Sequence, residues 1–105
     1  MNLTQLKIDC QNQARKCFDA FKNDVLNYPL KEEMTKTDLI AFGIDNSIEN
    51  GFRGGWMNTY MSSNLSKLQL KLYCDTIDYY KSLTCTVARN WGRKCLENKK
   101  PNQIK

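Results

Sequence analysis

The chain has 105 residues, of which 41% are hydrophobic and 26% charged, and it carries a formal net charge of +5. That length suits one domain, and that apolar content is typical of a folded chain rather than a disordered one. No apolar run exceeds the six residues 39–44, so no stretch is long enough to cross a bilayer as a helix. The absence of histidine excludes every mechanism that needs an imidazole as base or metal ligand.

The excess positive charge lies at the C-terminal end. Residues 1–85 carry ten basic and ten acidic side chains, which cancel. Residues 86–105 set six basic side chains against Glu97 alone: Arg89, Arg93, Lys94, Lys99, Lys100 and Lys105. Such an end attracts an acidic protein, anionic lipid headgroups or nucleic acid. The same cluster of basic residues is also expected at a helix C-terminus followed by a solvated tail, since cations are favoured at the negative end of a helix dipole.

A first helix is predicted from Thr4 to Asn27. Thr4 is a suitable N-cap, and Pro29 should end the helix because a proline disfavours helical geometry in the residue before it. The apolar positions recur at steps of three and four, which is the helical period; they are Leu6, Cys10, Ala14, Cys17, Phe18, Phe21, Val25 and Tyr28.

The middle of the chain, residues 29–63, is less regular. Thr37 could cap a second helix over 38–49, although Gly43 weakens that prediction by roughly 1 kcal/mol relative to alanine. Three glycines within residues 51–55 indicate a loop or a close approach of the backbone. One or two helical turns then follow from Trp56.

The last third contains the longest periodic segment, about thirty residues from Leu65 to Cys95. Ser63 or Asn64 can cap its start, Lys99-Lys100-Pro101 should end it, and Gly92 marks a kink or a close contact. No alternating stretch indicates a strand. We therefore predict an all-α protein, with two long helices forming an antiparallel hairpin plus one or two short helices. Residues 1–98 would form a single helical domain and 99–105 a basic tail.

No motif in the sequence indicates catalysis. The glycines at 51, 54 and 55 lack the spacing and the Lys-Ser/Thr of a phosphate-binding loop, and no CxxC pair occurs. A calcium loop over 45–56 fails because Trp56 stands where the bidentate glutamate should be. Tyrosines near Arg89 could stack on single-stranded nucleic acid, but most fall on the apolar positions of the helix. We expect a protein that is not an enzyme, with no cofactor and no metal.

Five cysteines stand at positions 10, 17, 74, 85 and 95. The residues before Cys10 have neither the apolar core of a secretory signal nor the arginines of a mitochondrial presequence. The cysteines are therefore either reduced core residues of a cytosolic protein or oxidised in a compartment reached without a cleaved signal. A secreted chain that has lost its signal is a third interpretation.

Two helices that each carry spaced cysteines resemble the twin-cysteine helical hairpins of the mitochondrial intermembrane space, which include accessory subunits of respiratory complexes. That family has two nine-residue spacings, whereas this chain has one, Cys85-x9-Cys95. The resemblance implies oxidised cysteines, with Cys10, Cys17, Cys74, Cys85 and Cys95 as the disulfide candidates. In an antiparallel pair of helices the unequal spacings permit one bridge, whereas two would need a kink or a crossing angle.

The sequence thus predicts a non-catalytic accessory subunit of a larger assembly, in a respiratory complex at the periphery of the mitochondrial inner membrane. One alternative is a small cytosolic inhibitor or adaptor, viral or phage-like, or a nucleic-acid-binding helical protein, that uses its basic C-terminal end; another is a secreted helical binding protein. The expected partners are protein subunits, then anionic lipid headgroups, with nucleic acid least favoured. The partner-binding candidates are Phe52, Arg53, Trp56, Arg89, Arg93, Lys94, Lys99 and Lys100.

Overall fold

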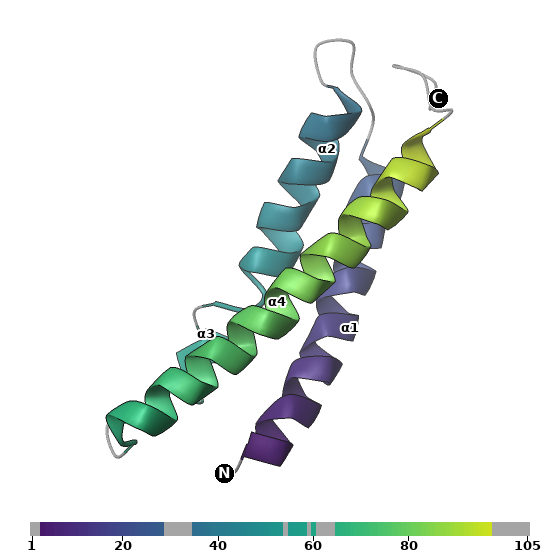
Figure 1. Cartoon of the computed structure of the whole chain (residues 1–105). Helices are drawn as coiled ribbons and strands as arrows, with labels where there is room; N and C mark the ends of the chain where they lie inside the picture. The colour runs from purple at the N-terminus through teal and green to yellow at the C-terminus, as the bar shows by residue number, and fades with distance from the viewer. Residues whose placement is uncertain (1–2, 29–34, 54, 59, 61–64, 98–105) are drawn as a thin grey trace.

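The computed structural model describes residues 3–28, 35–53, 55–58, 60 and 65–97, and these residues are helical or lie in turns, without a strand among them. The predicted all-α class is confirmed. The molecule is elongated, with extents of 52 × 19 × 17 Å (Figure 1). Its elements in chain order are α1 (Leu3–Asn27), α2 (Lys36–Gly43), the π-helical segment η1 (Ile44–Glu49), α3 (Gly55–Asn58) and α4 (Lys67–Leu96).

Two helices begin at capping boxes that correct the predicted start sites. The Thr35 hydroxyl accepts a hydrogen bond from the Asp38 amide at 3.0 Å, and the Asp38 carboxylate accepts one from the Thr35 amide at 3.3 Å. Ser66 and Gln69 form the same reciprocal pair at the start of α4. Thr35 and Ser66 therefore cap these helices, instead of the predicted Thr37 and Ser63 or Asn64, because each is followed three residues later by a side chain that closes the box.

The predicted middle helix extends without a break from α2 into η1. The π-type hydrogen bonds of η1 reach one residue further than α-helical ones, as in the 3.2 Å bond from the Asn50 amide to the Asp45 carbonyl. Residues 50–53 then form the turn that the glycine cluster predicted. At the N-terminus, α1 already begins at Leu3, so Thr4 lies inside the helix instead of capping it.

The two long helices run parallel, so the predicted antiparallel hairpin is wrong. Figure 1 shows α1 and α4 both running from the same end of the molecule, while α2 runs in the opposite direction beside them. Residues early in α1 meet residues early in α4, as in the hydrogen bond from Gln11 to Tyr80, and Phe18 meets Trp91 further along. The prediction failed because α2 and η1 together form a third long segment that runs antiparallel to α1. Since α4 in turn runs antiparallel to that segment, α4 has the same direction as α1.

The core lies where α1, α2–η1 and α4 meet. Phe21 is fully buried at its centre and packs edge-on against Trp91 with ring centroids 6.1 Å apart. Burial of one such side chain is worth about 1.5–3 kcal/mol. The core also includes Leu6, Cys10, Cys17, Val25, Leu39, Ile40, Ile44, Ile48, Phe52, Tyr60, Tyr73, Ile77, Cys85, Ala88 and Leu96.

Two glycines allow the helices to approach closely. A Cβ on Gly43 would lie 2.9 Å from the Phe21 ring, and a Cβ on Gly92 would lie 3.0 Å from Ile40 Cγ1. Gly43 is thus the contact point between α2 and α1, and Gly92 that between α4 and α2. The close contact predicted at Gly92 is confirmed.

Candidate protein-interaction surfaces

The partner-binding candidates of the middle segment divide between the core and the surface. Phe52 is 1% exposed and packs edge-on against Trp56 at 5.5 Å, so its ring belongs to the core and is not available to a partner in this fold. Trp56 is half-buried between Phe52 and Tyr60. Arg53 is exposed and pairs with Glu49 at 3.5 Å. Of these three candidates, Arg53 alone is fully exposed.

The basic candidates of α4 line a groove against α2. Arg89 and Arg93 lie on α4, and Lys36 at the start of α2 completes a set of three cations around a groove of about 220 Å³. Its other lining residues are Thr37, Ile40, Ala41, Ile44 and Leu96. The α2–α4 groove, as we call it, joins an apolar floor to a cationic rim.

No acidic side chain among the described residues forms an ion pair with Arg89 or Arg93. The Lys36 ammonium donates to the Glu97 carbonyl at 3.0 Å, which holds the lysine in place without neutralising its charge. The groove therefore keeps a positive charge that suits a carboxylate-bearing partner. Lys94 is exposed, while Lys99, Lys100 and the predicted tail 99–105 lie outside the described residues.

The five cysteines form no disulfide, and no two of them stand at bridging distance. Cys10, Cys17 and Cys85 are buried core side chains, and Cys74 and Cys95 are half-buried on α4. The Cys17 sulfur lies against Gly51, in space that a larger residue at 51 would fill. Cys10, Cys17 and Cys85 thus act as small apolar side chains of the core.

The buried thiols are held in the protonated form. Burial, with a smaller contribution from the neighbouring Asp9 carboxylate, raises the pKa of Cys10 to about 11. Burial also raises the pKa of Cys17 to about 11, reinforced by the nearby Cys85. A thiolate is the reactive form of cysteine, so these side chains are poor nucleophiles at neutral pH.

Five exposed apolar side chains form a row along α4, which we call the outer stripe. At about 100° of rotation per residue, its members fall within an arc of roughly 100° on the face of α4 that points away from the core. Each is 45–77% exposed. The members are Leu68, Leu72, Tyr79, Leu83 and Val87.

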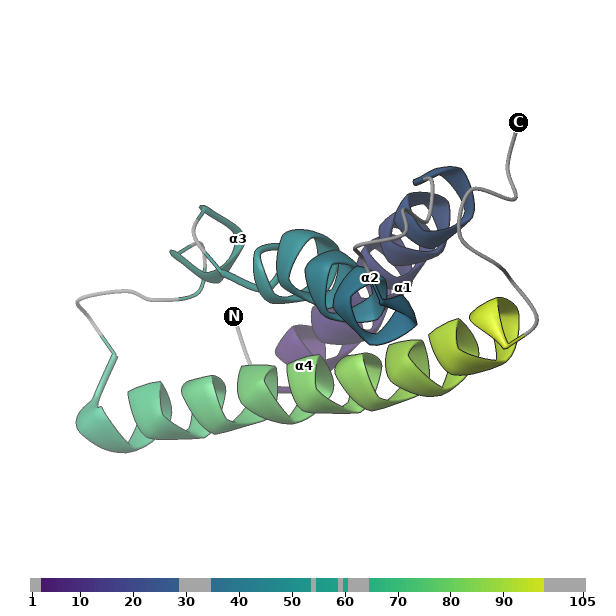
Figure 2. The same cartoon turned by 90° about the horizontal axis from the view of Figure 1, so that it is seen from above.

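Figure 2 shows why the outer stripe is uncovered: α4 runs along one side of the molecule, and α1 and α2 both lie on its other side. Leu68, Leu72 and Val87 belong to the apolar period of the predicted helix from Leu65 to Cys95, and that period alone does not separate them from the core positions. The sequence prediction missed that the apolar positions of α4 occupy two adjoining arcs, one centred near Ile77 and Ala88 and a second near Tyr79 and Leu83. Only the first arc is buried.

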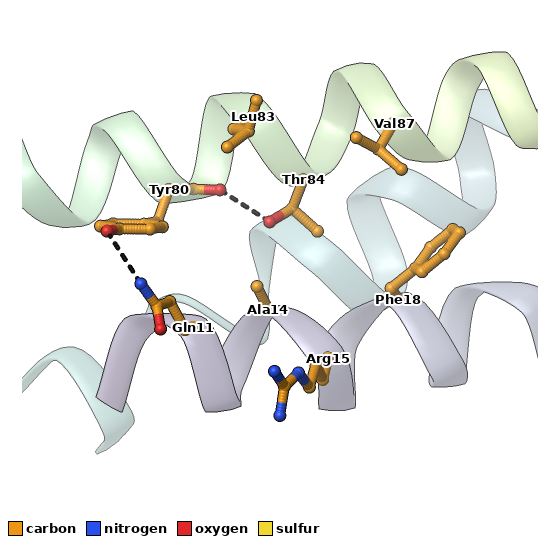
Figure 3. A pocket seen from close by; sticks show the side chains of 8 residues that line it. All are labelled: Gln11, Ala14, Arg15, Phe18, Tyr80, Leu83, Thr84 and Val87. Carbon is orange, nitrogen blue, oxygen red and sulfur yellow. Dashed lines mark hydrogen bonds between the residues drawn. The ribbon is translucent and has the colours of Figure 1, made fainter. Parts of the chain in front are cut away.

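The outer stripe continues into a groove between α1 and α4. This groove has a volume of about 310 Å³, and its lining is Gln11, Ala14, Arg15, Phe18, Tyr80, Leu83, Thr84 and Val87. Figure 3 shows Leu83 and Val87 on the α4 rim, with Ala14 and Phe18 below them on α1. At one end of the groove Gln11 donates a hydrogen bond to the Tyr80 hydroxyl at 3.4 Å, and Arg15 is the charged residue of its α1 side.

Within the described ranges, no cluster of three aspartate, glutamate or cysteine side chains could hold a metal ion. None of the described helices combines the length and apolar character of a membrane span. The chain matches no protein-family model, no curated protein and no solved structure. Its function is therefore inferred from its own surfaces.

Proposed function

We propose that this chain is a non-catalytic subunit of a larger protein assembly and that it packs on its partner through the outer stripe. The observation that carries the proposal is the exposure of Leu72, Tyr79 and Leu83 in one row on a long helix. Monomeric proteins seldom leave a contiguous apolar row in water, and such a row is characteristic of an interaction site. A helix of the partner with an apolar face of its own fits this row and the adjoining α1–α4 groove.

The test compares native assemblies in cells that make the protein. The variant Tyr79→Lys/Leu83→Lys places two charges in the stripe without touching the core, because both side chains are already exposed. Leu26→Lys is the control, since Leu26 is 55% exposed on α1 outside the stripe. We expect the stripe variant to leave the native complex on sizing chromatography and the control to stay. Retention of both variants in a complex of unchanged size contradicts the proposal.

A second candidate function is that of an adaptor for an acidic protein segment, and the α2–α4 groove favours it. Three cations border an apolar floor there, so a peptide with alternating acidic and apolar residues is the matching ligand. Fluorescence anisotropy with a labelled Glu/Leu peptide tests this function. Binding should weaken in salt and with Arg89→Gln/Arg93→Gln, and a Lys/Leu peptide should not bind. Equal binding of the two peptides rules the adaptor function out.

The mitochondrial location stays a prediction from the cysteine spacing alone. It requires oxidised cysteines in protein purified from its native source. Five thiols that react with an alkylating agent after denaturation, with no gain on reduction, contradict it and leave the assembly proposal intact.

A further inference from the structure

We infer that the α2–α4 groove binds a phosphorylated peptide segment, with the phosphate among the three cations of the rim and an apolar side chain of the same peptide on the floor. This inference rests on the adaptor function proposed above and names the chemical class of its ligand. It depends on the number of positive charges that border one small groove and on the kinds of side chain that carry them.

The rim of the groove carries more positive charge than a single carboxylate neutralises. Lys36, Arg89 and Arg93 each contribute one positive charge, and none of the other lining residues is acidic. These cations border a volume of only about 220 Å³. A carboxylate brings one negative charge, whereas a phosphate monoester brings about 1.5 to 2 at neutral pH, together with three strong acceptor oxygens. The phosphate is therefore the better match to this rim.

Helix capping and ion pairing do not account for all of this charge. Arg93 lies in the last turn of α4, where the helix dipole favours a cation. Arg89 lies one turn before it, and like charges four residues apart on a helix repel each other. Neither arginine forms an ion pair with another described residue. An anion that accepts from both arginines would remove this repulsion.

The donors come from two elements and suit a phosphate. Because Arg89 and Arg93 are one helical turn apart on the same face, both guanidinium groups can reach one anion. From the side of α2, the Lys36 ammonium is held by its 3.0 Å hydrogen bond to the Glu97 carbonyl, and Thr37 lines the groove beside it. Arginine forks bind phosphate oxygens in a bidentate manner, while lysine acts as a point charge.

The floor of the groove favours a peptide over a lipid headgroup. It consists of apolar side chains that lie next to the cations: Ile40, Ala41, Ile44 and Leu96. A phospholipid keeps its acyl chains in the bilayer when its headgroup is bound at the surface, so it would leave this floor unfilled. A peptide can place a phosphorylated residue on the rim and a neighbouring leucine on the floor at the same time.

The experiment is fluorescence anisotropy on the full chain with three labelled peptides that differ only at a central position. That position holds phosphoserine, glutamate or serine, and leucine stands on both sides of it. We expect the phosphoserine peptide to bind about tenfold more tightly than the glutamate peptide, because it makes more charge-assisted hydrogen bonds. The serine peptide should bind most weakly.

Two variants locate the binding. Arg89→Gln/Arg93→Gln should remove the preference for the phosphoserine peptide. The matched control is Lys71→Gln/Lys94→Gln, which removes the same charge from exposed sites on α4 outside the groove and should keep the preference. Circular dichroism checks that both variants retain the helical fold.

The outcomes separate this inference from the adaptor function. A preference for phosphoserine that is lost only in the groove variant supports the inference. Equal binding of the phosphoserine and glutamate peptides overturns it and leaves the adaptor function standing. Loss of the preference in both variants also overturns it, since the total charge of the chain would then be responsible.

A lipid ligand is tested with vesicles that contain phosphatidic acid. If the chain sediments with these vesicles and binds none of the peptides, the phosphate belongs to a lipid and the inference is overturned. If it binds neither, the inference and the adaptor function fail together, while the assembly proposal at the outer stripe is unaffected.

Discussion

The substitutions Gly43→Ala and Gly92→Ala should have different effects on stability, although both glycines are helical and buried. Alanine gains roughly 1 kcal/mol over glycine inside a helix, so propensity favours both changes equally. At Gly43 the new methyl would lie 2.9 Å from two atoms of the Phe21 ring. That ring is fully buried and held by Trp91, so it cannot turn aside, and overpacking costs about 1–3 kcal/mol.

At Gly92 the nearest atom belongs to the aliphatic Ile40 side chain, at 3.0 Å, which a small rotation relieves. Because the propensity gain is the same at both sites, we expect the free energy of unfolding of Gly43→Ala to lie about 1–3 kcal/mol below that of Gly92→Ala. Urea unfolding followed by circular dichroism measures both, with an unchanged m-value as the check on two-state behaviour. A Gly43→Ala protein as stable as the Gly92→Ala protein would refute the close packing of α2 on α1.

Three further predictions concern caps, pH and thiols. Ser66→Ala should reduce the free energy of unfolding by about 1 kcal/mol in urea titrations, because it removes the side chain that caps α4, whereas Ser82→Ala in the exposed middle of the helix should not reduce it. Because burial raises the pKa of Cys10 and Cys17 from 9.0 to about 11, the unfolded chain releases these protons first. Stability should be complete below pH 9 and fall as the pH rises towards 11, by roughly 2–3 kcal/mol per thiol; a flat profile of unfolding free energy over this interval contradicts that burial. In native protein at pH 8, Cys95, which is half-buried, should be alkylated faster than Cys10 and Cys17, as peptide mass mapping at timed intervals will show. Equal rates would be inconsistent with the described core.

The sequence predicted the two long helices well because each has a regular period of apolar residues. The apolar period of α1 predicted its helix and its buried residues Leu6, Cys10, Phe21 and Val25. The periodic stretch from Leu65 to Cys95 predicted α4 to within two residues at its start and one at its end. The start sites were less certain because several residues near each helix could serve as caps, and only the reciprocal bond to the third helical residue selects one.

Long-range features were harder to predict. The direction of α4 relative to α1 depends on whether the middle segment returns the chain, and the glycine at position 43 made that segment look weak when it was in fact the site of tightest packing against Phe21. Phe52 was predicted as a partner-binding residue but is buried and packs edge-on against Trp56. The outer stripe was missed because apolar residues at helical spacing do not show which of two adjoining arcs the rest of the fold covers.

The packing of a partner on the outer stripe is tested most directly by a photocrosslinker at position 79, introduced into the chain in the cells that make it. Trypsin cleaves after Lys71 and Lys81, so position 79 lies in peptide 72–81. We expect a crosslinked product that joins peptide 72–81 to a peptide of the partner, while a crosslinker at the exposed position 26 on α1 is the matched control. The absence of any crosslinked product from position 79 in the native complex would contradict the proposed packing.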